Sequence, residues 1–410
     1  MALLLRRVSL VNYKSIARCQ VDPNDLCLLV GPNGSGKSNF LDAIRLVSES
    51  LDSTLEYAIR QRGGINEVRR RSSGHPTHFT VSLRIGLDDG GNGLYAFKIG
   101  ATRDGSFRVQ QENAAISGDN YEAHYEIRDG EIKKFEFYED GKRYGASALA
   151  PTLTNITSDR LFLATLSGVA AFRPLFDALS KMGFYNINPA LVRELQPYQS
   201  GDLLQHDGGN IASVIKRLES DNPRALDRIQ QYLREIVPGI EGVHYRPLGP
   251  RETIEFRQRV PGAQKPWRFY AANMSDGTLR SLGVLTALFH RNGNNSPMTP
   301  LVAIEEPEST IHPGAAAVIM DALFEASHTA QILVTTHSPD LLDHEAIDST
   351  SILAFKNVDG VTTIAPVDKA SVSGIKEHLL TAGELLRNDQ LQPDDELGRP
   401  MIRQSDMFEM

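Results

Sequence analysis

The sequence predicts an α/β fold with a mixed or parallel sheet, on the evidence of three patterns in its 410 residues. Short apolar runs, each long enough for one strand, lie at 26–30, 301–304, 332–335 and 352–355. Helical patterns separate them, over 37–50, at about 278–290 and from Pro313. A glycine-rich turn joins the first run to the first helix. Strands that alternate with helices are typical of α/β units, and continuous apolar runs are typical of strands buried on both faces.

The N-terminal elements follow from local patterns. A first strand is expected at 3–13, and the strand at 26–30 is followed by the glycine-rich turn at 31–36. In the helix expected over 37–50, one face carries the apolar side chains of Phe40, Leu41, Ile44 and Val47.

The middle of the chain has a different character. Apolar and polar residues alternate through 79–145, which predicts an antiparallel meander. Asp-Gly pairs, which favour hairpin turns, interrupt the alternation at 89–90, 104–105, 129–130 and 140–141. Residues 155–240 look mostly helical, including a helix that begins at Pro223. A second antiparallel stretch is expected at 241–270.

These patterns divide the chain. Residues 1–78 and 271–370 are expected to form one α/β head, split by an insertion at 79–270 that supplies a β-rich arm and a helical lobe. Residues 371–410 are expected to form a C-terminal extension that is partly flexible, because its end is polar and acidic.

Composition excludes several classes of protein. Hydrophobic residues make up 41% and charged residues 23%, which is too apolar for a disordered chain. The net charge of −8 excludes a protein that is basic all over, but not a local basic groove. Cys19 and Cys27 are the only cysteines, which excludes a disulfide scaffold and suits a reducing cytoplasm. No signal peptide and no apolar run of membrane-spanning length is present, so no membrane partner is expected.

The first motif with chemical content is GPNGSGKS at 31–38, which fits GxxxxGK[ST]. Its glycines let backbone N–H groups point into one concavity that holds phosphate oxygens. Lys37 supplies a positive charge for the terminal phosphates, and the Ser38 hydroxyl is a ligand for Mg²⁺. The alternative is a chance glycine turn, which the position between a buried strand and an amphipathic helix disfavours.

The second motif is LVAIEEPE at 301–308, where an apolar strand ends in paired carboxylates. In a nucleotide site the first carboxylate, Glu305, holds the shell of Mg²⁺, and the second, Glu306, orients and deprotonates water. On its own this pattern is also a solvated acidic loop after a strand.

Two further motifs are ambiguous when each is taken alone. MSDGTLR at 274–280 opens a helix, where Ser275 or Asp276 is either part of an anion site or a plain N-cap. VTTHSPD at 334–340 ends a strand in His337, and Ser338 then caps the next helix.

Together the four motifs resemble those of the ATP-binding-cassette ATPases, and more narrowly the AAA_21-like P-loop ATPases of the RecF/SMC/OLD-like branch. The resemblance is firm over about 1–60 and 270–345 and loose over the insertion. It implies a head with a mixed or parallel P-loop sheet, ATP and Mg²⁺ as cofactors, and ATP sandwiched between the two subunits of a head-to-tail homodimer.

The resemblance also implies roles for individual residues. Glu305 would ligate Mg²⁺ with Ser38, although the branch usually has aspartate there; Glu306 would be the general base and His337 the switch histidine. Ser275 and Gly277, with Asp276 between them, would complete the partner's site. The residues expected to bind the phosphates are Asn33, Gly34, Ser35, Gly36, Lys37, Ser38, Asn39 and, from the opening strand, Lys14.

Some features of the branch are missing or weak. OLD nucleases carry a Toprim domain with a DxD motif, and no DxD follows His337, so any nuclease is expected to be a separate chain. The glutamine of the Q-loop is unclear, with Gln61 as a weak candidate. A basic cluster is either a solvated face or a contact for DNA or RNA; it consists of Arg60, Arg62, Arg69, Arg70 and Arg71.

The function expected from the sequence is an Mg²⁺-dependent ATP hydrolase whose head dimerisation acts as a switch in DNA repair or anti-phage defence. The switch would act on nucleic acid or on a separately encoded nuclease or other effector. Two alternatives remain: a slowly hydrolysing scaffold that docks a nuclease, and the motor subunit of a transporter. The meander and the unclear Q-loop argue against the transporter.

Overall fold

The fold is mixed α/β, as predicted. A computed structural model of the chain describes residues 4–72, 74, 76–87, 89–119, 121–139, 142–145, 157, 159–290, 299–398 and 405–409. Within these residues, one sheet of 14 strands runs in the order β10-β15-β16-β3-β17-β18-β2-β1-β4-β5-β6-β7-β8-β9.

Five neighbouring strands at one end of this sheet are parallel. They are β10 (Gly183–Tyr185), β15 (Leu301–Glu305), β16 (Gln331–Thr336), β3 (Leu26–Val30) and β17 (Ile352–Val358). The sequence predicted four of them, and β10 lies in a segment that looked helical. Carboxyl ends of parallel strands meet at one edge of a sheet, and this edge is where open α/β sheets bind ligands.

The other strands continue the same sheet as a largely antiparallel ribbon. They are β18 (Val361–Pro366), β2 (Ile16–Val21), β1 (Leu5–Tyr13), β4 (His78–Gly86), β5 (Asn92–Ala101), β6 (Phe107–Ser117), β7 (Glu122–Arg128), β8 (Glu131–Glu139) and β9 (Lys142–Gly145). Strands β4 to β9 form the antiparallel meander expected at 79–145. Its Asp-Gly pairs at 89–90, 104–105 and 129–130 form turns with left-handed glycines, and the pair at 140–141 lies outside the described residues.

Buried side chains of β3 show why the parallel strands read as continuous apolar runs. Leu26, Leu28 and Val30 enter one hydrophobic core, while Cys27 and Leu29 enter a second core on the opposite face. The helices that pack their apolar side chains into this second core are α1 (Lys37–Asp52), α2 (Leu55–Gln61), α3 (Ile65–Val68), α4 (Phe162–Thr165) and α5 (Arg173–Ser180). Because every residue of β3 is buried, no polar face interrupts its sequence.

The face of the parallel strands that carries Leu26, Leu28 and Val30 is covered by a second group of helices. They are α6 (Pro189–Arg193), α7 (Ile211–Asp221), α8 (Pro223–Ile236), α9 (Asp276–Phe289), α10 (Ala316–Ser327), α11 (Pro339–Leu342) and α13 (Ala382–Arg387). Helix α10 follows a short 3₁₀ turn at Pro313–Ala315, so the helix expected from Pro313 begins three residues later.

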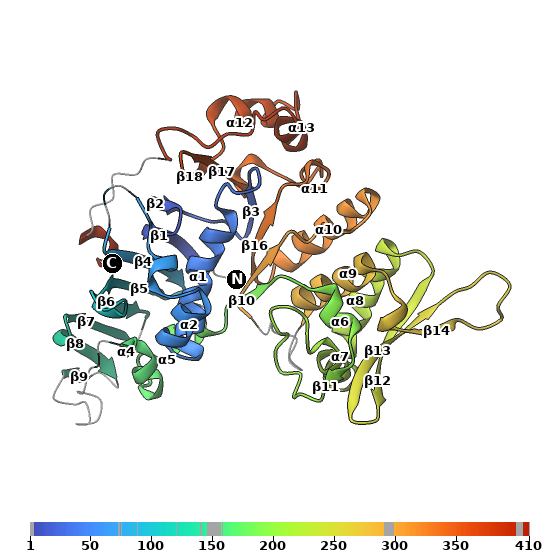
Figure 1. Cartoon of the computed structure of the whole chain (residues 1–410), viewed down its shortest axis with the longest axis horizontal. Coiled ribbons are helices and arrows are strands. Elements are labelled where there is room, and N and C mark those ends of the chain that lie inside the picture. Colours follow the sequence, from blue (N-terminus) through green and yellow to red (C-terminus); the bar gives the residue numbers. More distant parts are fainter. Residues whose placement is uncertain are drawn as a thin grey trace.

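A smaller antiparallel sheet lies beside this second group of helices and projects at the right of Figure 1. Its strands are β11 (Gln196–Pro197), β13 (Arg251–Gln258) and β12 (Ile240–Leu248), with β14 (Trp267–Tyr270) paired to β13. It matches the antiparallel stretch expected at 241–270.

Part of the expected C-terminal extension forms regular elements in the described residues. Helices α12 (Lys369–Lys376) and α13 pack above β17 and β18 in Figure 1, and a backbone bridge joins Val367 to Pro393. Residues 405–409 lie on the meander.

Within the described ranges, no single helix combines the length and apolar character needed to cross a bilayer. One sharply bent pair, Phe162–Gly168 with Arg173–Ser180, passes that test by length and composition only.

A buried carboxylate joins the meander to the helices beside it. Glu112 of β6 is 1% exposed, and burial raises the pKa of its carboxyl group. The carboxylate accepts four hydrogen bonds, from the Tyr125 hydroxyl at 2.6 Å, Phe162 N at 2.6 Å, Tyr95 hydroxyl at 3.0 Å and Leu163 N at 3.0 Å.

We expect Glu112→Ala to lower the free energy of unfolding by about 3–5 kcal/mol, because it leaves several buried donors without an acceptor. Urea denaturation followed by circular dichroism measures this loss. The matched Glu112→Gln variant keeps one acceptor oxygen in place and should lose clearly less. Equal stability of Glu112→Ala and the wild type would contradict the role assigned to this carboxylate.

Candidate active site

The glycine-rich loop, Glu305, Glu306 and His337 lie together at the carboxyl edge of the parallel strands. The glycine-rich loop follows β3, Glu305 ends β15, and His337 follows β16, which lies between those two strands. Sheet order therefore brings together segments that are about 270–300 residues apart in the sequence.

The glycine-rich loop holds its shape through glycine conformations and a contact from β18. Gly34 and Gly36 have φ angles of 76° and 104°, which favour glycine. A Cβ on Gly36 would lie 2.3 Å from the Thr362 hydroxyl oxygen, and that hydroxyl donates a hydrogen bond of 2.9 Å to Ser35 O. Any side chain at position 36 would therefore displace β18 from the loop.

Lys37 places its ammonium group inside this loop. Its Nζ donates hydrogen bonds to Gly31 O at 2.7 Å and to Pro32 O at 3.1 Å. Burial lowers the pKa of Lys37, while the negative charges of Glu306 and Glu308 act against that shift. A buried cation in a loop of backbone donors suits the oxygens of a polyphosphate.

Ser35 gives a direct test of whether the loop fits a phosphate. Its side chain is 1% exposed, and its hydroxyl oxygen has no hydrogen-bond partner among the residues that the structure describes. Buried hydroxyl groups in native proteins are normally paired. A phosphate oxygen would supply the acceptor, so the residues present fit this group.

Oxygen ligands for a divalent cation lie next to the loop. Ser38 Oγ donates a hydrogen bond of 2.8 Å to Glu305 Oε2, so the hydroxyl and the carboxylate already face one another. No group of three or more His, Cys, Asp or Glu side chains in the described residues has the arrangement of a metal site. Magnesium sites at phosphates typically use one or two protein oxygens, with water and phosphate completing the shell.

Asn39 stabilises the loop through a chain of side-chain hydrogen bonds that reaches β18. Its Nδ2 donates a hydrogen bond of 2.8 Å to Ser15 Oγ, which lies 2.7 Å from the Thr362 hydroxyl oxygen. Asn33 lies at the exposed tip of the loop.

The second carboxylate faces the predicted histidine. His337 Nδ1 lies 3.3 Å from Glu306 Oε1, and Ser309 Oγ donates a hydrogen bond of 3.1 Å to Glu306 Oε2. Both side chains are partly open to solvent, at 45% for His337 and 37% for Glu306. Glu306 has a φ of 44°, and its N–H donates to Thr335 O at 2.9 Å. Such backbone strain is concentrated at functional sites.

A third carboxylate of the same motif is buried behind these two. Glu308 Oε1 accepts a hydrogen bond of 2.5 Å from the Thr336 hydroxyl, and burial raises the pKa of Glu308. Its Oε2 has no hydrogen-bond partner within the described part of the chain. No pattern in the sequence distinguishes Glu308 from the other carboxylates of the motif.

Arg280 is a second residue that the sequence did not single out. It lies on α9, is 8% exposed, and its guanidinium donates hydrogen bonds to Ile187 O at 2.7 Å and to both Glu305 O and Glu306 O at 2.9 Å. These contacts fix the backbone that carries the two carboxylates. No local pattern in the sequence marks Arg280, because the carbonyl groups that it contacts are 25, 26 and 93 residues away in the sequence.

The residues of the predicted signature motif act as a helix cap within this chain. Ser275 Oγ accepts a hydrogen bond of 3.2 Å from Thr278 N, and Asp276 forms an ion pair with Arg193. A Cβ on Gly277 would lie 2.6 Å from Thr310 O, so glycine allows the loop after Glu306 to approach α9. In the described residues, no hydrogen bond joins 275–277 to the glycine-rich loop.

Lys14 is paired with a carboxylate on α1. Its Nζ lies 2.5 Å from Asp42 Oδ2, and Asp42 also accepts from the Tyr13 hydroxyl at 2.7 Å and Arg62 Nε at 2.9 Å. Burial raises the pKa of Asp42, but Arg62 and Lys14 outweigh burial and hold it below its usual value. Lys14 reaches this network because it follows Tyr13 in a left-handed conformation, with a φ of 45°.

Arg62 does not belong to an exposed basic surface. Its side chain is 6% exposed and is paired with Asp42 and Glu49. Arg69 donates to Pro76 O, and Arg71 is paired with Glu67. The basic cluster therefore consists partly of internal ion pairs.

Gln61 is exposed at the end of α2 and has no place at this edge of the sheet. Asn186 directly follows β10, whose Tyr185 pairs with Ile304 of β15, and it is exposed.

Comparisons with known proteins identify similar sequences and a similar fold. A family model described as "AAA domain, putative AbiEii toxin, Type IV TA system" matches residues 26–343. The chain is 21% identical over 368 residues to "Old nuclease" of Escherichia phage P2, covering 83% of this chain and 58% of that protein. It is 32% identical over 122 residues to "Structural maintenance of chromosomes protein 1" of Schizosaccharomyces pombe, covering 28% of this chain and 10% of that protein.

The chain thus spans less than two thirds of the length of either relative. Among solved structures, the SMC head bound to the C-terminal winged-helix domain of ScpA matches with a TM-score of 0.54 and 15% identity, covering 88% of this chain and 97% of that one. At this level of identity the match shows a shared fold.

Proposed function

Because the chain belongs to the family described as "AAA domain, putative AbiEii toxin, Type IV TA system", within the RecF/SMC/OLD-like branch of ABC-type P-loop ATPases, we propose that it hydrolyses ATP with Mg²⁺. The observation that carries this proposal is the meeting of Lys37, the Ser38–Glu305 pair and the Glu306–His337 pair at one edge of the sheet.

Each residue has a chemical task in this proposal. Lys37 and the backbone of the glycine-rich loop bind the terminal phosphates, with Ser35 donating its hydroxyl. Ser38 and Glu305 would hold Mg²⁺, which would neutralise charge on the phosphate oxygens.

The hydrolytic step needs a base. Glu306 takes one proton from the attacking water as the oxygen–phosphorus bond forms and the bond to the leaving ADP breaks. His337, 3.3 Å away, orients Glu306 and can donate to the phosphate.

We further propose that ATP closes a head-to-tail homodimer, in which Ser275 and Gly277 contact the ATP of the other subunit. Support comes from the geometry of α9, whose capped N-terminus is exposed at Ser275 and bonds to no loop residue of its own chain in the described residues. Helix N-termini are favourable sites for phosphate. Arg280 links the same helix to Glu305 and Glu306, which ties dimer closure to the catalytic carboxylates.

Ser275→Arg tests the composite site. We expect it to spare ATP binding to the monomer and to abolish ATP-dependent dimerisation, because a bulky cation would occupy the place of the phosphate. Light scattering with ATP measures dimerisation. The substitution also removes a helix cap, which costs about 0.5–2 kcal/mol of stability, so Ser275→Gly, which costs only a few tenths, is the control for folding.

Mixing this variant with Lys37→Ala extends the test. In a mixed dimer, one site carries both defects and the other carries neither. Turnover above that of either variant alone supports composite sites. If Ser275→Arg changes neither dimerisation nor turnover, Ser275 is only the cap of α9 and the sandwich proposal fails.

The proposed output is a switch, in the cytoplasm, on nucleic acid or on a separate effector such as a nuclease, in DNA repair or anti-phage defence. The relatives named above, a nuclease and a chromosome-maintenance protein, support this range of outputs. Steady-state ATP turnover measured with and without DNA and RNA tests it. Faster ATP turnover in the presence of DNA or RNA identifies which nucleic acid acts on the switch. Very slow turnover under every condition favours the slowly hydrolysing scaffold.

A further inference from the structure

The small antiparallel sheet of β11, β12, β13 and β14 carries surplus positive charge. Residues 240–270, which hold three of these strands, contain six arginine and lysine residues and three glutamates, whereas the whole chain has a net charge of −8. The glutamates add little negative charge to the surface, because Glu252 and Glu255 are 1% and 2% exposed and Glu241 is paired with Arg259. The sheet is therefore basic on a protein that is acidic as a whole.

Alternation along β13 places this charge on one face of the sheet. Ile254 and Phe256 point into the core that the sheet shares with α7 and α8. The odd-numbered side chains of β13 and their cross-strand partners therefore share the opposite face. We call this surface the arginine face; it consists of Arg246, Arg251, Glu255, Arg257, Arg268 and Tyr270.

Arg246 is the arginine of this face whose charge is balanced. Glu255 accepts hydrogen bonds of 2.8 Å from Arg246 Nε and 3.1 Å from Arg246 Nη2, and this pairing holds the pKa of Glu255 below its usual value. Glu219 of α7, at the edge of β12, also attracts Arg246 and accepts a hydrogen bond of 3.2 Å from Tyr245 N. Arg246 is therefore a fixed part of the face.

Arg257 and Arg268 are not balanced in this way. Their Nε atoms lie 3.6 Å and 3.9 Å from Glu255 Oε1, which is beyond hydrogen-bonding distance, and neither guanidinium donates a hydrogen bond in the described part of the chain. The two residues are direct cross-strand partners, and like charges in that position destabilise a sheet. An anion bound between them removes the repulsion, and guanidinium groups match the oxygens of a phosphate.

The length of the face and one aromatic ring favour a nucleic acid over a single phosphate. Arg251 and Arg257 are six residues apart on one extended strand, which corresponds to about 20 Å. Tyr270 is 43% exposed and pairs with Glu255, so its ring lies among the arginines. Cations that follow a phosphate backbone, next to an exposed ring on which a base stacks, are typical of sites for single strands.

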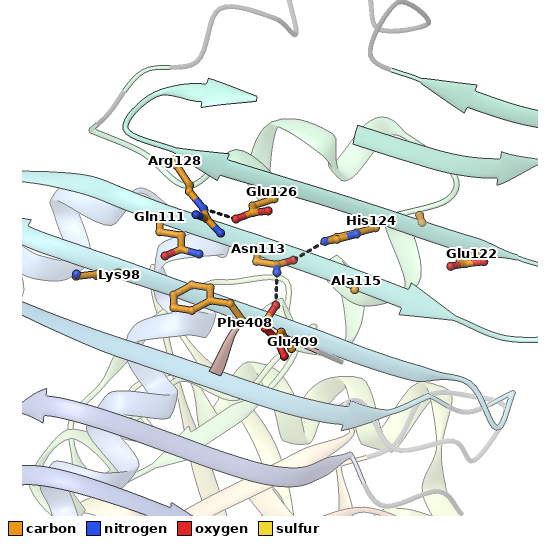
Figure 2. A pocket seen from close by; sticks show the side chains of 11 residues that line it. Lys98, Gln111, Asn113, Ala115, Glu122, His124, Glu126, Arg128, Phe408 and Glu409 are labelled. Atoms are coloured by element: carbon orange, nitrogen blue, oxygen red, sulfur yellow. Dashed lines mark hydrogen bonds and ion pairs between the residues drawn. The ribbon is translucent and has the colours of Figure 1, made fainter. Parts of the chain in front are cut away.

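Arginines on the meander are used differently. Arg128 of β7 is exposed but is paired with Glu126, and Glu122 lines the same cavity of about 570 Å³ (Figure 2). Positive and negative groups therefore alternate over that face, whereas the arginine face has one carboxylate for four arginines.

We propose that the arginine face binds single-stranded nucleic acid, with the phosphate backbone on Arg251, Arg257 and Arg268 and a base stacked on Tyr270. This deepens the switch proposed above by giving its nucleic acid a surface, and it rests on that proposal for any effect on ATP turnover. Binding itself needs no ATP. Loss of binding with turnover intact, and loss of turnover with binding intact, are therefore separate results.

The test measures binding of a fluorescein-labelled oligothymidylate, about 20 nucleotides long, to the full-length protein by fluorescence anisotropy without ATP. Replacing both Arg257 and Arg268 by alanine should weaken binding at least about tenfold, because two charged contacts are lost. The slope of log Kd against log salt concentration should fall by about 1.4, the contribution of two phosphate contacts on a single strand. Thermal unfolding should show no loss of stability, because the change removes a repelling pair.

Tyr270→Ala separates stacking from charge. It should weaken binding about fivefold or more while the salt dependence stays unchanged, because stacking involves no charged group. Trp267→Ala removes an exposed ring from the opposite face of β14, and Arg128→Ala removes an exposed arginine from the meander. Both controls should bind as the wild type does.

The proposal is overturned if the wild type shows no saturable binding, or if the folded double variant binds equally well. Tighter binding of duplex DNA than of the single strand also overturns it. Binding of phosphatidylserine vesicles or polyglutamate that the double variant loses to the same extent does so too, because the face is then a general anion surface. An oligouridylate that binds through the same residues supports the proposal, and its affinity shows whether RNA or DNA is preferred.

Discussion

Replacing Lys37 by alanine is expected to weaken ATP binding by about a hundredfold or more and to abolish turnover. The ammonium group lies inside the glycine-rich loop, where it contacts Gly31 O and Pro32 O and where burial lowers its pKa. Hydrogen bonds to charged groups contribute about 1.5–3 kcal/mol each, and each 1.4 kcal/mol changes affinity tenfold. Isothermal titration calorimetry with ATP measures the loss.

Two controls separate this effect from a general loss of charge or of folding. Lys265→Ala removes an exposed lysine beyond β13 and should leave ATP affinity unchanged. Thermal unfolding of Lys37→Ala should be close to that of the wild type, because the two hydrogen bonds of its ammonium group stay within its own loop. Unchanged affinity in a folded Lys37→Ala variant would overturn the assignment of residues 31–38 as a phosphate-binding loop.

The parts of the fold that could be predicted from the sequence are those whose patterns have a local physical cause. The apolar run at 26–30 was recognisable because every residue of β3 is buried, and the Asp-Gly pairs marked turns that depend on left-handed glycines. Strand β10 escaped prediction because it is three residues long and is stabilised by pairing with β15. The division of the chain into a head, an insertion and an extension stays a prediction, and the meander continues the sheet of the head through β1 and β4.

Long-range contacts limit how much of the candidate site can be predicted from the sequence. Motifs predicted Lys37, Ser38, Glu305, Glu306 and His337 as one group, and the structure places them at one edge of the sheet. Arg280 gains its position from contacts with Ile187, Glu305 and Glu306, which are far away in the sequence, so no local pattern marks it. Arg62 looked like part of a surface cluster because only the fold shows that Asp42 and Glu49 surround it.

The same reasoning explains the C-terminal segment. A polar, acidic composition predicts a loose chain, and Met407 and Phe408 are too few to suggest a packed element. The side chains that donate to this segment, from Ser82, Arg84 and Asn113, lie about 300 residues earlier in the sequence. They face the segment together only because β4 and β6 pair with the two edges of β5.

Glu306→Gln is expected to bind ATP and to lower kcat by about 100- to 10,000-fold, the usual range for loss of a general base. Glutamine keeps the size of the side chain and an oxygen that accepts from Ser309 Oγ, so the strained backbone at φ 44° should be retained. What it loses is the ability to take a proton from water. Steady-state phosphate release measures the effect on turnover.

Because bound ATP would persist, the variant should also accumulate the closed dimer that is proposed above. Light scattering with ATP and Mg²⁺ should show a stable dimer for Glu306→Gln and a monomer without nucleotide. Glu345→Gln, which changes an exposed carboxylate away from the site, is the control for loss of charge. Turnover of Glu306→Gln at the wild-type rate would show that Glu306 is not the base, and the role would pass to another group near His337.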